Sequence, residues 1–143
     1  MRGVYTLILE ICEDVFFGVG RLGNVHFQKG FYAYVGSALS GLEARVSRHL
    51  RDAKKTFWHI DYLLPQRYAK EIIFGVTDCK KECDIANILH TRFEWVRGFG
   101  SSDCGCWSHL FYSESLEELK VMVAEAYKKN HLDHQFLPLQ NFV

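Results

Sequence analysis

The feature of the sequence that most constrains the fold is a pair of short motifs, Gly3-Val4-Tyr5 and Tyr34-Val35-Gly36, each set in an apolar, β-rich run. The first motif opens the run 4–11, whose β-branched and aliphatic residues are typical of a strand. The second lies within 31–37, where alternate side chains point to opposite faces of a second strand. The intervening segment 15–28 has a Gly/Asn turn between two short apolar runs, which predicts a β-hairpin.

The remainder of the chain alternates between helical and strand patterns. Ser40-Gly41-Leu42-Glu43 is a capping-box sequence and predicts a helix that runs to about Ala53. The further predicted elements are a short helix at 57–64, a strand at 71–76, a helix capped by Asp78 that runs to about Phe93, and a strand at 110–112. A second capping box, Ser115-Leu116-Glu117-Glu118, opens an amphipathic helix at 115–129. This order predicts an α/β protein (an α+β sandwich) with a small central, mainly antiparallel sheet flanked by helices. The length favours a single domain over 1–143, with a C-terminal helix and arm from about 115.

Charge is balanced overall and unevenly distributed. Lys and Arg together number 17, Asp and Glu together also number 17, and the formal net charge is zero. Five basic residues gather in one stretch: Arg45, Arg48, Arg51, Lys54 and Lys55. Such a stretch is either a solvated helix face or a local contact for a phosphate backbone. The chain starts on a strand-like run without the pattern of a secretory signal, so we expect a cytoplasmic protein with no membrane partner.

Three side chains take telling positions on the predicted helices. Arg45 and His49 are four residues apart, so they share a face beside the apolar stripe of the first helix. Glu82 heads the apolar stripe of the helix that follows Asp78, so its carboxylate is expected to point toward the protein. A carboxylate in that position is costly unless a cation or a hydrogen-bond donor meets it.

Tyr5 and Tyr34, followed by Arg45 on a helix and by an inward-facing Glu82, resemble the motif of the GIY-YIG nuclease superfamily. Two further segments, Trp58-His59-Ile60-Asp61-Tyr62-Leu63-Leu64 and Gly100-Ser101-Ser102-Asp103-Cys104 with Ser108-His109-Leu110-Phe111-Tyr112, resemble one branch of it. That branch is the Uri-type endonuclease family, long catalogued as a domain of unknown function. The alternative is that both tyrosines are ordinary residues of a strand core.

The resemblance implies a divalent-metal-dependent endonuclease that hydrolyses phosphodiester bonds in DNA. DNA repair is one process in which such an enzyme would act. It implies that the catalytic residues are Tyr5, Tyr34, Arg45, His49 and Glu82. Glu82 would hold Mg²⁺ or Mn²⁺, and Tyr5 or Tyr34 would accept a proton from the attacking water. Arg45 would brace the charge that develops on the phosphoryl oxygens, and His49 would orient the proton path or the phosphate.

Other residues would contact the nucleic acid or support the site. The expected DNA contacts are Ser37, Arg48, Arg51, Lys54 and Lys55, with Ser37 standing where many members of the superfamily have lysine. The expected supporting residues are His59, Asp61, Ser101, Asp103 and His109. Many members also have an asparagine late in the domain, which has no clear counterpart here unless Ser101, Ser102 or Asp103 takes its place. A protein partner or a homodimer would be compatible with so small a chain.

Two further functions remain open from the sequence. The first is a catalytically silent DNA-binding module on the same fold. The second is a zinc-stapled structural or interaction protein, because Cys79, Cys83, Cys104 and Cys106, with His109 nearby, supply soft ligands of the kind that zinc prefers. The spacing is not that of a standard zinc finger, and buried free thiols are the alternative to a zinc site.

Overall fold

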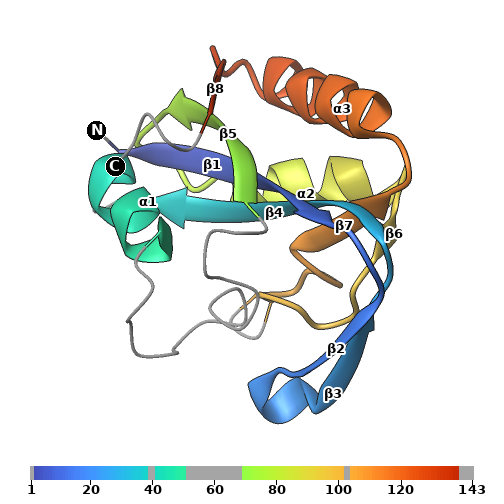
Figure 1. Ribbon diagram of the computed structural model, residues 1–143. Helices are drawn as coiled ribbons and strands as arrows, with labels where there is room; N and C mark the ends of the chain where they lie inside the picture. The colour runs from blue at the N-terminus through green and yellow to red at the C-terminus, as the bar shows by residue number, and fades with distance from the viewer. Residues whose placement is uncertain (1, 39–40, 51–68, 102–103, 139–143) are drawn as a thin grey trace.

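The computed structural model of the chain describes residues 2–38, 41–50, 69–101 and 104–138 (Figure 1). The strands of these residues are β1 (Gly3–Ile11), β2 (Val15–Gly18), β3 (Asn24–Phe27), β4 (Gly30–Ala38), β5 (Ala69–Val76), β6 (Glu94–Trp95), β7 (Leu110–Ser113) and β8 (Gln135–Pro138). The helices are α1 (Leu42–Leu50), α2 (Glu82–His90) and α3 (Leu116–Lys129), and a 3₁₀ turn, η1 (Gly20–Leu22), joins β2 to β3.

Six of the strands form one sheet in the order β6-β7-β4-β1-β5-β8, and β2 and β3 form a separate hairpin. Every pair of neighbouring strands in both sheets is antiparallel. The two motif strands, β1 and β4, lie side by side at the centre, with Tyr5 opposite Gly36 and Leu7 opposite Tyr34. The predicted class, a mixed α+β fold around an antiparallel sheet, is therefore confirmed.

Two apolar cores lie on the two faces of the sheet. Tyr5, Leu7 and Tyr34 face a core that includes Leu42 of α1 and Phe99 of the segment between β6 and β7. The alternate residues of the same strands face a second core, formed with buried side chains of α2 and α3: Ile85, Ala86, Leu89, Leu119, Val123 and Ala126. Figure 1 shows α2 and α3 on one side of the sheet and α1 at the end of β4. The period-two pattern of the strands thus assigns the tyrosines to the face opposite α2 and α3.

Capping explains where α3 begins, but it does not explain the start of α2. Ser115 accepts a hydrogen bond from the backbone N–H of Glu118 at 3.1 Å, which confirms the cap predicted for the last helix. The prediction that Asp78 caps α2 is wrong, because that helix begins at Glu82 after Lys81 and has no side-chain cap. Asp78 instead lies 3.9 Å from the guanidinium of Arg2.

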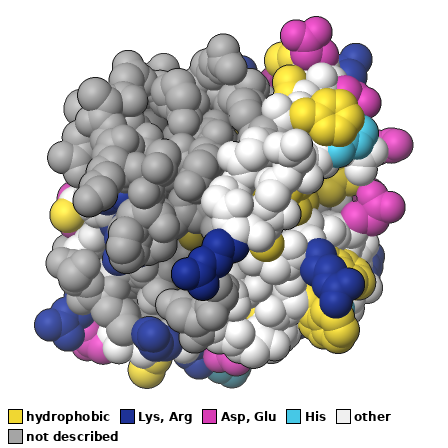
Figure 2. Space-filling model, turned by 90° about the horizontal axis from the view of Figure 1, so that it is seen from below, with side chains coloured by type: hydrophobic (Ala, Val, Ile, Leu, Met, Phe, Trp, Pro, Cys, Tyr) yellow, Lys and Arg dark blue, Asp and Glu magenta, His cyan; other side chains and the backbone are white. Residues whose placement is uncertain are grey.

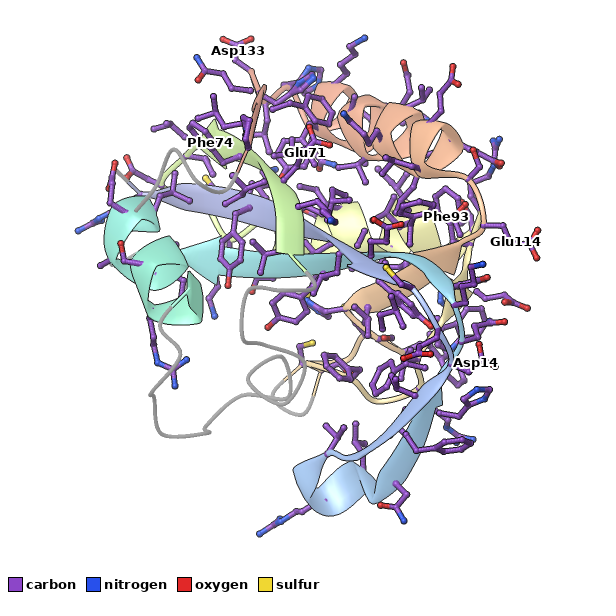
Figure 3. All side chains as sticks on the ribbon, in the orientation of Figure 1. Asp14, Glu71, Phe74, Phe93, Glu114 and Asp133 are labelled. Carbon is purple, nitrogen blue, oxygen red and sulfur yellow. The ribbon has the colours of Figure 1, made fainter. Side chains whose placement is uncertain are left out.

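The arm predicted after the last helix contains β8, which adds a strand to the sheet beside β5. Lys120 of α3 ties these elements together, because its Nζ lies 2.9 Å from Glu71 Oε2 and 5.1 Å from the ring centroid of Phe136. Figure 3 shows Glu71 between β5 and α3. Among the described residues, no helix is both long and apolar enough to cross a membrane.

The two motif glycines are required by close approaches within the sheet. A Cβ on Gly36 would overlap the ring of Tyr5, coming within 2.9 Å of its Cε1. A Cβ on Gly3 would overlap the carbonyl oxygen of Gly75 and lie 3.0 Å from Leu42 Cδ1. Distances below about 3.4 Å are tighter than carbon atoms tolerate without displacement. The glycines of both motifs therefore have a packing reason that is independent of any activity.

Candidate functional site

Tyr5 and Tyr34 form the centre of the candidate site on the face of the sheet that carries α1. Their ring centroids are 6.4 Å apart and the ring planes are tilted by 52°. Tyr5 is 1% exposed and Tyr34 is 7% exposed. Tyr5 rests over Gly36, and Tyr34 lies against Gly100, where an added Cβ would come within 3.0 Å of the tyrosine Cε1. Both rings are therefore held by close contact with a glycine backbone.

Arg45 lies next to this pair because of where α1 begins. The helix starts four residues after the end of β4, and the Arg45 Nη1 donates a hydrogen bond to the Ser37 carbonyl at 3.0 Å. Ser37 directly follows Gly36, over which the Tyr5 ring lies. The structure thus brings Tyr5, Tyr34 and Arg45 to one end of β4, whereas Glu82, also expected to be catalytic, begins α2, the helix that packs against the opposite face of the sheet.

The other residues proposed for DNA contact are only partly covered by the described structure. Arg48 is half-buried on α1, and the Ser37 Oγ is buried with no hydrogen-bond partner among the described residues. Three of the expected DNA contacts lie outside the described residues: Arg51, Lys54 and Lys55. Other predicted site residues also lie outside them, namely the side chain of His49 and the whole of His59, Asp61, Ser102 and Asp103. Figure 2 shows the Lys and Arg side chains of one face at separate positions on the part of that face that is not grey.

A group of metal-ligating side chains lies where α2 meets the segment between β6 and β7. The Sγ atoms of Cys83, Cys104 and Cys106 and a ring nitrogen of His109 all lie within 4.8 Å of one another. The His109 Nε2 is 3.4 Å from Cys104 Sγ and 3.8 Å from Cys83 Sγ. We call these four residues the Cys/His group; they are able to bind one metal ion.

The membership of this group corrects the zinc site predicted from sequence. Cys79 is exposed and lies outside the group, and its backbone N–H bonds to the Thr77 hydroxyl at 3.1 Å. The reason is the late start of α2 at Glu82, which leaves Cys79 in the preceding turn. His109, expected as a supporting residue, occupies the fourth position. The signal was already present in the spacing Cys104-x-Cys106-x₂-His109.

Backbone hydrogen bonds hold the Cys/His group in place. The segment between β6 and β7 is folded back on itself, with bonds from Gly98 N to Trp107 O at 2.8 Å and from His109 N to Phe99 O at 2.8 Å. In addition, the Cys104 N–H donates to Ser101 O at 3.3 Å. Ser101, expected as a supporting residue, is thus buried beside Cys104.

Two thiols of the Cys/His group, those of Cys83 and Cys106, have raised pKa values that favour their protonated form in the absence of a cation. Burial raises the pKa of Cys83 above its usual range, and the adjacent thiols of Cys106 and Cys104 add to the rise. Burial also raises the pKa of Cys106, and the charge of Glu82 contributes in the same direction. Negative charges close together oppose further ionisation, so these thiols lose their protons to a bound cation more readily than to water.

Glu82 begins α2 beside Cys106, on the helix that packs against the face opposite the tyrosines. Its Oε2 is buried and has no hydrogen-bond partner among the described residues. A buried carboxylate oxygen without a donor is costly, and a cation is one partner that removes the cost. Glu82 therefore has the donor chemistry that a divalent cation requires, and its inward orientation agrees with the helical pattern.

A hollow of about 480 Å³ lies apart from these residues. It is lined by His26, Gln28, Tyr32, Glu94, Trp95, Val96 and Tyr112. Tyr5, Tyr34, Arg45 and Glu82 are not among the described residues that line this hollow. Gly100 links the tyrosine pair to the Cys/His group. A Cβ added to Gly100 would lie 3.0 Å from Tyr34 Cε1 and 3.3 Å from the Cβ of His109.

Comparison with known families assigns the chain. The family described as Domain of unknown function DUF123 matches residues 4–132. The chain belongs to this family. The DUF123 match runs from β1 to just beyond α3, so it includes Tyr5, Tyr34, Arg45, Glu82 and the Cys/His group, and it ends before β8. Searches of curated proteins and of solved structures returned no match.

Proposed function

We propose that this member of the DUF123 family is a GIY-YIG-type, specifically Uri-type, endonuclease that hydrolyses phosphodiester bonds in DNA with Mg²⁺ or Mn²⁺. The observation that carries the proposal is the pairing of Tyr5 and Tyr34 on one face of the sheet, beside Arg45. Arg45 bonds to the Ser37 carbonyl near the end of β4, the strand that holds Tyr34. Packing explains the motif glycines, but it does not by itself require two phenols and a guanidinium together. Phosphoryl transfer needs proton transfer and charge stabilisation at one place, and these side chains supply both.

Each residue has a distinct part in the proposed reaction. One tyrosine of the pair, in its phenolate form, accepts a proton from the attacking water and becomes a neutral phenol. Arg45 braces the negative charge on the phosphoryl oxygens, to which a guanidinium is well matched in shape. Glu82 would hold the divalent cation, which when bound supplies Lewis-acid polarisation of the phosphate.

The deciding experiment is a nicking assay on supercoiled plasmid, branched DNA and single-stranded DNA with Mg²⁺ or Mn²⁺. It compares the wild type with Tyr34→Phe and Glu82→Gln. Tyr32→Phe is the matched control, because Tyr32 lies on the same face of β4 and is 2% exposed, but its hydroxyl donates to the Gln28 carbonyl at 2.7 Å. Loss of a general base typically slows a reaction by about 10² to 10⁴.

We expect wild type and Tyr32→Phe to nick DNA, and Tyr34→Phe and Glu82→Gln to lose at least about a hundredfold in rate. Equal cleavage by Tyr34→Phe and wild type would refute the role of the tyrosine pair. If the wild type binds DNA in a salt-dependent manner but never cleaves it, the chain is a silent DNA-binding module and the proposal fails.

A further inference from the structure

We infer that the Cys/His group is a structural zinc site that fixes the segment between β6 and β7 against α2 and β4. This inference does not depend on the nuclease proposal, since it concerns a second metal, different ligands and a different role. Three thiols and one imidazole form a donor set that favours zinc over magnesium or manganese. Four protein ligands fill a tetrahedral sphere, which is the mark of a structural site and not of a catalytic one.

The separations of the ligand atoms fit one zinc ion. Zn–S bonds of about 2.3 Å and Zn–N bonds of about 2.0 Å in a tetrahedron place sulfur and nitrogen about 3.5 Å apart. The two S···N separations in the Cys/His group are 3.4 Å for Cys104 and 3.8 Å for Cys83. All four ligand atoms lie within 4.8 Å of one another, so only small side-chain adjustments are needed to reach the ideal geometry.

The hydrogen bonding of His109 prepares its other nitrogen for a metal. The Nδ1 lies 3.0 Å from the Val35 carbonyl oxygen, which only accepts hydrogen bonds, so Nδ1 carries the proton. In the neutral imidazole this leaves the lone pair on Nε2, the atom that faces the thiols. Metal-binding histidines usually have such a bond, which sets both the tautomer and the ring orientation.

The site joins parts of the chain that pack on opposite faces of the sheet. Cys83 comes from α2, which packs on one face of the sheet, while Phe99 of the β6–β7 segment packs on the other. His109 links the group to β4 through Val35, and Gly100 lies against Tyr34. Zinc would therefore hold the backbone on which the Tyr34 ring rests. Binding transfers the three thiol protons to solvent and leaves three thiolates and a neutral imidazole around Zn²⁺.

The first test measures zinc in the full-length chain purified under reducing conditions. Elemental analysis is expected to give one zinc per chain for the wild type and near zero for Cys83→Ser. Cys12→Ser and Cys79→Ser are matched controls, because both cysteines are exposed and lie outside the group, and they are expected to keep the full zinc content. Replacement of zinc by Co²⁺ should give a thiolate-to-cobalt charge-transfer band and the visible bands of a tetrahedral site.

The second test uses only the wild type, so it does not depend on the folding of a variant. Cysteine alkylation is counted by mass spectrometry with and without a zinc chelator. We expect only Cys12 and Cys79 to react in the zinc-bound chain, and all five cysteines to react after chelation. The inference is overturned if the wild type, after zinc has been added back, holds no stoichiometric zinc. It is also overturned if Cys79→Ser loses zinc as Cys83→Ser does, or if chelation leaves the alkylation pattern unchanged. If the wild type holds zinc but does not cleave DNA, the nuclease proposal is rejected and the zinc inference stands.

Discussion

The contact between Gly36 and Tyr5 predicts that Gly36→Ala is strongly destabilising although it adds a single methyl group. The backbone at Gly36 has no left-handed conformation, so alanine is not strained by its dihedral angles. On that ground alone the substitution would stabilise the chain by about 0.4 to 1 kcal/mol, because it restricts the unfolded state. A measured decrease in the free energy of unfolding would therefore come from the packing contact between the new Cβ and Tyr5.

The magnitude follows from the room available at this point of β4. The new Cβ would overlap Cζ and Oη of Tyr5 and lie 2.9 Å from Cε1. The ring is 1% exposed and packed on all sides, so it has no free space to enter. Overpacking of a tight core costs about 1 to 3 kcal/mol, and we expect the upper end, about 3 kcal/mol. For 143 residues the unfolding entropy is about 0.3 kcal/mol/K, so the melting temperature should fall by about 10 °C.

Thermal and urea denaturation of four proteins test the reasoning: wild type, Gly36→Ala, Tyr5→Leu and the double variant. If the clash with the ring is the cause, Gly36→Ala costs much less in the Tyr5→Leu background. Gly18→Ala on β2 is the control, because its added Cβ would meet only Asn24 Oδ1 at 3.5 Å, an ordinary contact. Additivity of the two changes within about 0.5 kcal/mol would refute the proposed contact.

Two other perturbations have clear expected outcomes. Tyr127→Phe removes a buried hydroxyl that donates to the Ile73 carbonyl at 3.2 Å. The free energy of unfolding, measured by urea denaturation, should fall by about 1 to 3 kcal/mol with little change in the sheet. A neutral effect would mean that the carbonyl finds another donor. The backbone N–H of Lys29, 2.8 Å from Asp14 Oδ1, lowers the pKa of the Asp14 carboxyl, so the hairpin contact contributes stability above about pH 4 and loses it as pH falls through the lowered pKa. Carboxyl NMR titration should give an Asp14 midpoint below the ordinary value, and a midpoint at or above about 4 would contradict the assignment.

Local patterns in the sequence predicted most elements of the fold. The β-branched content of β1, the alternation in β4, the turn residues of the hairpin and the cap at Ser115 are local features, and each predicted its element correctly. Two strands were missed because long-range pairing creates them. β6 has only Glu94 and Trp95 and exists through its bonds to β7, and β8 is an unremarkable polar and apolar mixture until β5 provides an edge.

The candidate sites show the same limit. The shared face of Tyr5 and Tyr34 follows from strand periodicity, and the place of Arg45 follows from the start of the helix after β4. The zinc ligands depended on where α2 begins. A helix that started at Asp78 would have put Cys79 and Cys83 on one face, whereas the start at Glu82 removes Cys79 from the site. No local pattern fixed that start, because the residue before it, Lys81, is a poor cap.

The packing reasons for Gly3 and Gly36 change how the motif should be read. Each glycine is demanded by a close approach, to the Gly75 carbonyl or to the Tyr5 ring, that exists whether or not the protein has activity. A match to these positions therefore argues for the central β1–β4 pair, and a silent DNA-binding module would need the same glycines. The proposed activity would rest instead on polar groups, namely the Tyr34 hydroxyl, the Arg45 guanidinium and the buried Glu82 oxygen. Only substitutions that keep the shape and remove the polar atom, as Tyr34→Phe and Glu82→Gln do, separate chemistry from fold.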